Sequence, residues 1–204
     1  MKFNKVNILA AAAAVILVGC ATPKPGTPEF VQKKEDEQQK AAVKTVEQTV
    51  SKAPAWFTQP PVDSNAIYQT ATMISISMQA SKDSAIRKAR GELARQLGAR
   101  VSEKIKEFVN ESGNDVDTQV EGIINSASFT VTNDQNVAGY TLEKSEFFAE
   151  GDKYRAYVLI RYPVGENNKV IAAQIKKNAL LENKVKASKA WEDLENEIEK
   201  AKKK

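Results

Sequence analysis

Cysteine and histidine, the residue types that most often carry nucleophilic and acid–base chemistry, are almost missing from this chain. Its 204 residues include one cysteine, Cys20, and no histidine. Ser-His-Asp triads, zinc sites of the His/Cys type and disulfides within the chain are therefore excluded. Catalysis would have to depend on carboxylates, lysines or hydroxyl groups, and the sequence predicts no catalytic, metal-binding or cofactor-binding residues.

The tightest cluster of acids consists of Asp115, Asp117 and Glu121. Paired carboxylates cleave glycosidic bonds in many hydrolases, so a carboxylate-dependent hydrolase acting on peptidoglycan or another glycan is one hypothesis. The same acids stand at the start of a predicted helix, where they would cap the first turn and complement the helix dipole. We expect this structural role and keep the hydrolase as the less favoured alternative.

Cys20 points to covalent lipid attachment. It closes a Leu-Val-Gly-Cys run at 17–20, directly after an apolar stretch whose start carries Lys2 and Lys5. This is the layout of a bacterial lipoprotein signal peptide, and the apolar stretch is too short for a stable membrane span. We expect residues 1–19 to be removed and Cys20 to be acylated by palmitate-type chains. A plain secretory signal or an uncleaved anchor is the alternative.

Such an anchor would hold the protein permanently at a membrane, since each buried methylene contributes about 0.8 kcal/mol and three acyl chains are attached. Ala21 follows the cysteine, where an aspartate would often signal inner-membrane retention. The outer membrane is therefore the predicted location, on its periplasmic face or at the cell surface. Without the two signal-peptide lysines, 28 basic residues remain against 26 acids, so no nucleic acid partner is expected. No small-molecule substrate is expected either.

Residues 20–53 are predicted to form a polar tether behind the anchor, extended at its prolines and helical at 41–50. An unstructured leader without a spacing role is the alternative. At 54–61 the composition changes abruptly, because Trp56 and Phe57 are flanked by prolines. Prolines hold such a segment extended, so the two rings can dock on the domain as a clasp. An exposed partner-binding surface is the alternative, and Trp56 and Phe57 are candidate interface residues for that reason.

The predicted domain spans 54–165. Alternation over 67–78 indicates a strand, and a long amphipathic helix follows, capped by Ser81 or Asp83 and ended by Gly113. The apolar positions of that helix are three or four residues apart: Ile86, Ala89, Leu93, Leu97, Val101, Ile105 and Phe108.

A second helix, capped by Asn114 or Asp115, is expected next. The strands 140–149 and 154–162 then form a hairpin. This order predicts an α+β fold with helices on one face of a mainly antiparallel sheet.

The long helix also carries a basic face that includes Arg87, Arg95 and Lys104. A solvated surface is the favoured interpretation, because acids are interleaved and no stacking aromatics accompany the charges. The alternative is a module that binds peptidoglycan or anionic lipid.

Residues 166–204 are expected to form a charged C-terminal helical extension. Trp191, Leu194 and Ile198 follow heptad steps and are candidate interface residues. The extension could form a coiled coil, or Trp191 could dock on the domain, and the sequence is consistent with both arrangements.

The cysteine box, the polar spacer, the Pro-x-Trp-Phe entrance and the helix with Ala85, Ala89, Arg90, Glu92 and Leu93 form a recognisable assembly. It resembles the Lpp-twenty lipoprotein family, small outer-membrane lipoproteins that include the flagellar lipoprotein FlgP, over residues 54–163. The resemblance implies a non-enzymatic structural or assembly role in the cell envelope, with a place at the flagellar motor as one possibility. Self-association or binding of another envelope protein is the expected mode of action.

Substitution of Cys20 by serine should abolish lipid attachment, because acylation requires the thiol. Metabolic labelling with a fatty acid analogue checks this, and the expected result is label on the wild type alone. Label on the Cys20→Ser protein, or none on the wild type, would contradict the anchor.

Overall fold

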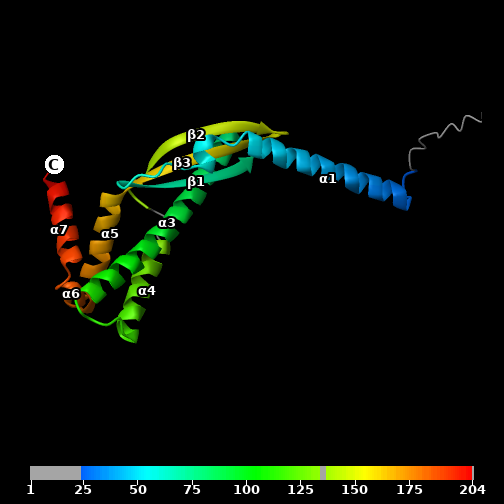
Figure 1. Cartoon of the computed structure of the whole chain (residues 1–204). Helices are drawn as coiled ribbons and strands as arrows, with labels where there is room; N and C mark the ends of the chain where they lie inside the picture. Colours follow the sequence, from blue (N-terminus) through cyan, green and yellow to red (C-terminus); the bar gives the residue numbers. More distant parts are fainter. Residues whose placement is uncertain (1–23, 134–136, 204) are drawn as a thin grey trace, which may run out of the picture. The chain divides into compact units, whose positions relative to one another are not determined.

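The computed structural model describes residues 24–133 and 137–203, so Cys20 and the predicted signal peptide lie outside the described residues. Contacts divide the chain into two compact units, Met1–Val46 and Glu47–Lys204. Along the chain, shown in Figure 1, the elements are α1 (Pro28–Ser51), α2 (Ala55–Thr58), β1 (Ala66–Ser75), α3 (Met78–Glu111), α4 (Thr118–Asn133), β2 (Thr141–Glu150), β3 (Lys153–Pro163), α5 (Val164–Lys176), α6 (Ala179–Val185) and α7 (Lys189–Lys202). No helix in these described ranges is long and apolar enough to cross a membrane.

Helix α1 begins earlier than the sequence predicted. Thr27 caps it by accepting a hydrogen bond from the Phe30 backbone N–H at 3.3 Å, and Pro28 occupies the first turn, where its missing N–H costs nothing. The predicted helix at 41–50 is thus the second half of a longer helix that starts at Pro28. The physical reason is that the charged run 33–40 consists almost entirely of good helix formers, namely lysine, glutamate and glutamine. None of the α1 residues is buried.

The predicted α+β fold is confirmed. Its sheet has three strands in the order β1-β3-β2, and both pairings are antiparallel. The predicted hairpin forms from β2 and β3 across Gly151 and Asp152, and Gly151 has a φ of 63°, which glycine adopts without strain. Strand β1 closes the other side of β3, with Ala66 opposite Pro163 and Ser75 opposite Tyr154.

The start of α3 corrects two predictions. Strand β1 ends at Ser75, and Ser77 caps the helix by accepting a hydrogen bond from the Ala80 N–H. Ser81 is instead buried inside the helix, where its hydroxyl donates to the Met78 carbonyl at 2.7 Å. The predicted strand ended too late because Ile76 and Met78 continue the apolar alternation, although they stand at the turn and the helix start and are exposed.

The end of α3 is as predicted. Gly113 has a φ of 73°, its N–H donates to the Asn110 carbonyl, and the next N–H, from Asn114, donates to the Val109 carbonyl. These two hydrogen bonds satisfy carbonyls that the last helical turn would leave without a donor.

Helix α3 covers one face of the sheet, and α4 packs along α3 (Figure 1). The two helices approach most closely at Gly98, where an added Cβ would lie 2.1 Å from Thr132 Oγ1. The Ser128 hydroxyl donates to the Gly98 carbonyl at 2.8 Å and ties the helices together at this point. The predicted apolar stripe of α3 forms the centre of the core, in which Leu93, Val101 and Ile105 are fully buried.

The C-terminal segment is helical as predicted, but it is part of the folded unit. Helices α5 to α7 belong to the compact unit Glu47–Lys204, and Ile175, Leu181 and Val185 contribute fully buried side chains to its core. A domain limit at residue 165 is therefore too early. The sequence suggested one continuous helix, whereas caps at Asn178 and Ser188 start two new helices that turn back on α3.

Leu93→Ala should lower the free energy of unfolding by about 2–5 kcal/mol, because the substitution leaves a cavity beneath the sheet. Denaturant unfolding of the purified chain measures the change. The control is Gln96→Ala on the exposed side of the same helix, which should change stability by less than about 0.5 kcal/mol. Equal effects of the two substitutions would show that Leu93 is not a core residue.

Candidate functional site

The acidic cluster serves the start of α4. The Asp117 carboxylate accepts a hydrogen bond from the Val120 N–H at 2.9 Å, so Asp117 is the cap that the sequence assigned to Asn114 or Asp115. Glu121 lies 3.7 Å from Lys106 of α3, and Asp115 is exposed. The Asn114 side chain instead donates to the Lys184 carbonyl at 2.8 Å and holds the end of α6. Asp117 therefore has the capping role that was expected for these acids.

Several carboxylates in the described part of the chain are stabilised in their ionised form. The pKa values of Glu111, Asp117, Glu150 and Glu199 lie below their ordinary range, chiefly because each carboxylate accepts a hydrogen bond from a serine, a backbone N–H, an arginine or a lysine. A glycosidase requires at least one carboxylic acid whose pKa is raised so that it can donate a proton. Within residues 24–133 and 137–203, no three acids, cysteines or histidines converge as a metal site.

The segment that contains Trp56 and Phe57 docks on the sheet. Docking was the first of the two interpretations of this segment, the other being an exposed partner-binding surface. Phe57 packs edge-on against Tyr157 of β3, with ring centroids 4.8 Å apart, and Trp56 Nε1 donates to a Glu146 oxygen of β2 at 2.6 Å. The segment is not extended, however, because residues 55–58 form the single helical turn α2 after Pro54. These rings cover the face of the sheet opposite α3. Trp56 and Phe57 remain partly exposed.

Tyr157 is the centre of this second face. Its ring also packs against Phe148 at 5.7 Å, and its hydroxyl donates to the Thr49 carbonyl at 3.2 Å. Burial raises the pKa of Tyr157, so the phenol stays protonated and continues to donate. Beside it, Arg155 and Glu150 form an ion pair across the hairpin, which lowers the pKa of Glu150.

Of the other candidate interface residues, Trp191 and Leu194 are buried within the chain. Their exposed fractions are 5% and 7%, and Ile198 is partly buried against the same core. The Trp191 ring lies 5.9 Å from the Phe108 ring of α3. Docking is therefore the arrangement observed for α7, and it leaves little of Trp191 and Leu194 for a partner. The aromatics of α2 and α7 form two separate clusters on different elements.

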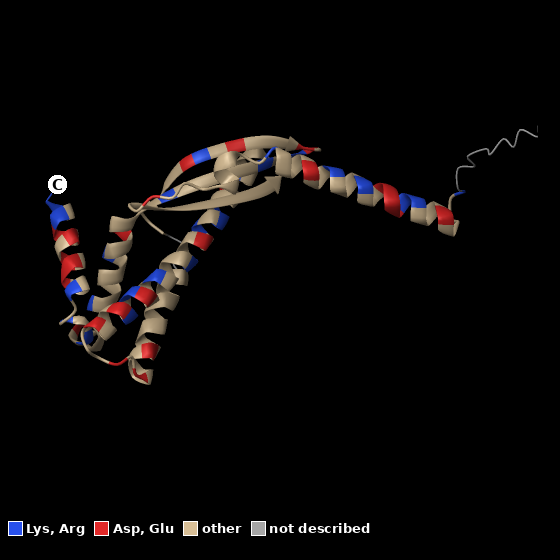
Figure 2. Ribbon diagram, in the orientation of Figure 1, with Lys and Arg blue, Asp and Glu red and all other residues tan. Residues whose placement is uncertain are grey.

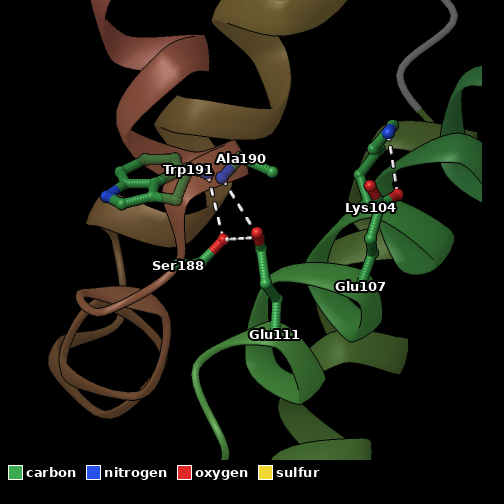
Figure 3. Close-up of polar contacts among 6 residues, drawn as sticks. All are labelled: Lys104, Glu107, Glu111, Ser188, Ala190 and Trp191. Atoms are coloured by element: carbon green, nitrogen blue, oxygen red, sulfur yellow. Dashed lines mark hydrogen bonds and ion pairs between the residues drawn. The ribbon is translucent and has the colours of Figure 1, made fainter.

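A polar cluster holds α7 on the end of α3 (Figure 3). Ser188 caps α7 by accepting from the Trp191 N–H at 3.1 Å, and its hydroxyl donates to a Glu111 oxygen at 2.5 Å. The same oxygen accepts from the Ala190 N–H at 3.1 Å. Glu111 thus places a negative charge at the positive end of the α7 dipole, and the Ser188 hydrogen bond is the main reason that its pKa is lowered.

The basic face of α3 is locally neutralised. Figure 2 shows acidic residues interleaved with basic ones along this helix. Arg95 pairs with Glu92, and Lys104 pairs with Glu107 at 2.7 Å. Arg90 lies over the Tyr140 ring, 5.4 Å from its centroid. Arg95 and Lys104 thus have acidic partners on the same helix, whereas Arg90 is half-buried against Tyr140.

The sequence did not indicate a groove between α4 and α5. Two adjoining hollows of about 430 and 460 Å³ share Thr130, Gln174 and Lys177. Leu97 and Tyr162 also line the first hollow, and a Glu166–Lys169 ion pair of 2.7 Å lies beside them. No local signal could reveal this groove, because α4 and α5 are distant in sequence and are brought together by packing on α3.

No family model, curated protein or solved structure matches this chain. The resemblance to the Lpp-twenty family thus stays a prediction that rests on the sequence motifs.

Glu111→Gln should loosen α7 and make its docking less dependent on pH. A carboxylate whose pKa is lowered by folding stabilises the native state at neutral pH, and this contribution is lost as the pH falls through the lowered pKa. Trp191 fluorescence measures docking in a Trp56→Phe background, which leaves Trp191 as the one tryptophan.

The control is Glu107→Gln, one turn earlier on α3, whose carboxylate pairs with Lys104 (Figure 3). Glu107→Gln should leave the pH dependence of α7 docking the same as in the Trp56→Phe protein. If the two variants give the same pH profile, Glu111 does not hold α7.

Proposed function

We propose that this chain is a non-enzymatic lipoprotein of the outer membrane with a structural or assembly role in the cell envelope. The observation that carries the proposal is the Leu-Val-Gly-Cys run ending at Cys20, behind a short apolar segment with a basic start. Acylation of Cys20 would tether the folded unit, and binding to other envelope proteins or to further copies of the chain would be its means of action.

The chemistry of the described residues supports a role by contact. Hydrogen bonds from structural partners lower the pKa values of Glu111, Asp117, Glu150 and Glu199 and hold these acids in their ionised form. Asp117 is also occupied in capping α4. Among the described residues that line the groove between α4 and α5, one is a carboxylate, Glu166, and it is paired with Lys169. A hydrolase would need an acid and a second carboxylate facing one substrate.

The resemblance to the Lpp-twenty family, which includes a flagellar lipoprotein, adds the flagellar motor as one candidate place for this role. Two kinds of partner remain as alternatives to an envelope protein, namely peptidoglycan and anionic lipid bound by the basic face of α3. Co-sedimentation with purified sacculi and with anionic liposomes distinguishes them from a protein partner. Purification of native complexes from membranes would identify a protein partner directly.

The triple substitution Asp115→Asn, Asp117→Asn and Glu121→Gln should leave function nearly unchanged. The expected cost is about 1 kcal/mol of stability from the weakened cap. Complementation of a deletion strain measures function, and a melt together with membrane fractionation confirms that the variant folds and stays anchored. A folded, anchored and inactive variant would overturn the non-enzymatic proposal in favour of the hydrolase.

A further inference from the structure

The two edge strands of the sheet differ sharply in how they are protected. Strand β3 lies in the middle, so β1 and β2 each have one side that pairs with no strand of residues 24–133 and 137–203 (Figure 1). Strand β2 carries Glu143, Lys144, Glu146 and Glu150, and its register shifts between Leu142 and Lys144. Charges and irregularities of this kind keep an edge strand from pairing with another chain.

Strand β1 has none of these protections. Its ten residues, Ala-Ile-Tyr-Gln-Thr-Ala-Thr-Met-Ile-Ser, contain no charged residue and no proline. They pair with β3 without interruption from Ala66 to Ser75. Figure 2 shows the contrast between the charged β2 and the uncharged β1. A long, regular and uncharged edge strand is a template for a further strand.

The hydrogen-bond pattern identifies the backbone groups that face this free edge. The Val164 N–H donates to the Asn65 carbonyl, and these residues continue the register in which Ala66 faces Pro163. In an antiparallel pair the residues alternate, so the odd-numbered residues of β1 bond β3 and the even-numbered ones point away. Tyr68, Thr70, Thr72 and Ile74 therefore present their N–H and C=O groups outward.

Among the described residues, only one of these outward groups has a hydrogen-bond partner. The Gln69 side chain donates to the Thr70 carbonyl at the weak distance of 3.4 Å. Ile74 and Ile76 also leave 38% and 76% of their surfaces exposed at the same end of the strand. The edge thus combines unsatisfied backbone groups with apolar side chains.

We propose that β1 pairs with β1 of a second copy of this chain, antiparallel, so that two three-stranded sheets join into one. A second copy is the favoured occupant because an uncharged strand meets no repulsion from itself, whereas pairing with β2 would require its charged and irregular edge. A two-fold axis also makes the row of outward groups self-complementary.

The register centred on Ala71 satisfies this geometry. It places Tyr68 opposite Ile74 and Thr70 opposite Thr72 of the second copy, so that each outward N–H meets an outward carbonyl. Aromatic with β-branched and threonine with threonine are favourable cross-strand pairs. The proposal specifies the self-association expected under the proposed function, and it does not depend on lipid attachment.

Ile74→Lys tests the edge by adding one charge at an exposed position. Its matched control is Leu142→Lys on β2, since Leu142 has an exposed fraction of 37% against 38% for Ile74. Sedimentation velocity of the full chain in detergent should give dimers for the wild type and the control. Association of the Ile74→Lys protein should be weaker by about tenfold or more, because the lysine must be desolvated beside Tyr68.

Thr70→Pro provides a second variant that acts on the backbone. Proline removes an N–H that points to the free edge and leaves the bonds to β3 intact, so the melting temperature at low concentration should be preserved while dimers are lost.

Hydrogen exchange of the peptide containing β1, followed by mass spectrometry, gives a measurement that is specific to this strand. The amides of Tyr68, Thr70, Thr72 and Ile74 should be protected in the wild type and in Leu142→Lys, and should exchange rapidly in Ile74→Lys. A monomeric wild type, or dimers that persist in both Ile74→Lys and Thr70→Pro, would overturn the edge pairing. Complementation and partner purification would still decide the proposed function, so the two failures are distinguishable.

Discussion

Burial of β3 on both faces is the constraint on which the rest of the fold depends. Ala156, Val158 and Ile160 face α3, whereas Tyr157 and Leu159 face the other way, and all are buried to within 2% exposure. A strand without a solvent face must have a strand on each side and a cover on each face. Strands β1 and β2 are the neighbours on its two sides. Helix α3 covers one face, and the α2 aromatics cover the other.

Coverage of the two faces is unequal, and this has consequences for function. Helix α3 spans its face and carries α4 to α7 on its own flanks, so the large core forms there. The opposite face is covered mainly at Tyr157, by Phe57 and Phe148. The proposed second copy would extend the sheet beyond the uncharged edge of β1, in the plane between these two faces.

Polar residues in this protein secure junctions between elements. Asp117 starts α4, Asn114 holds α6, and Glu111 with Ser188 fixes the start of α7. Each satisfies backbone groups that a helix end would otherwise leave unpaired. The same hydrogen bonds lower the pKa values of Asp117 and Glu111, so both carboxylates stay ionised at neutral pH.

Features that depend on neighbouring residues could be predicted from the amino-acid sequence. The period of the α3 stripe, the Gly113 stop, the hairpin at Gly151 and the α+β class follow from local patterns, since helix and strand periodicities and glycine turns are properties of short segments. The ends of elements were less predictable, because several polar residues compete to cap a helix and β1 continues its alternation into a turn. Three features became visible only in the folded chain. Trp191 packs on Phe108, and α4 and α5 border a groove. Strand β1 lies at the edge of the sheet, while β3 is central. These depend on which distant segments share one core, and a burial pattern along the chain does not specify which partner buries each face.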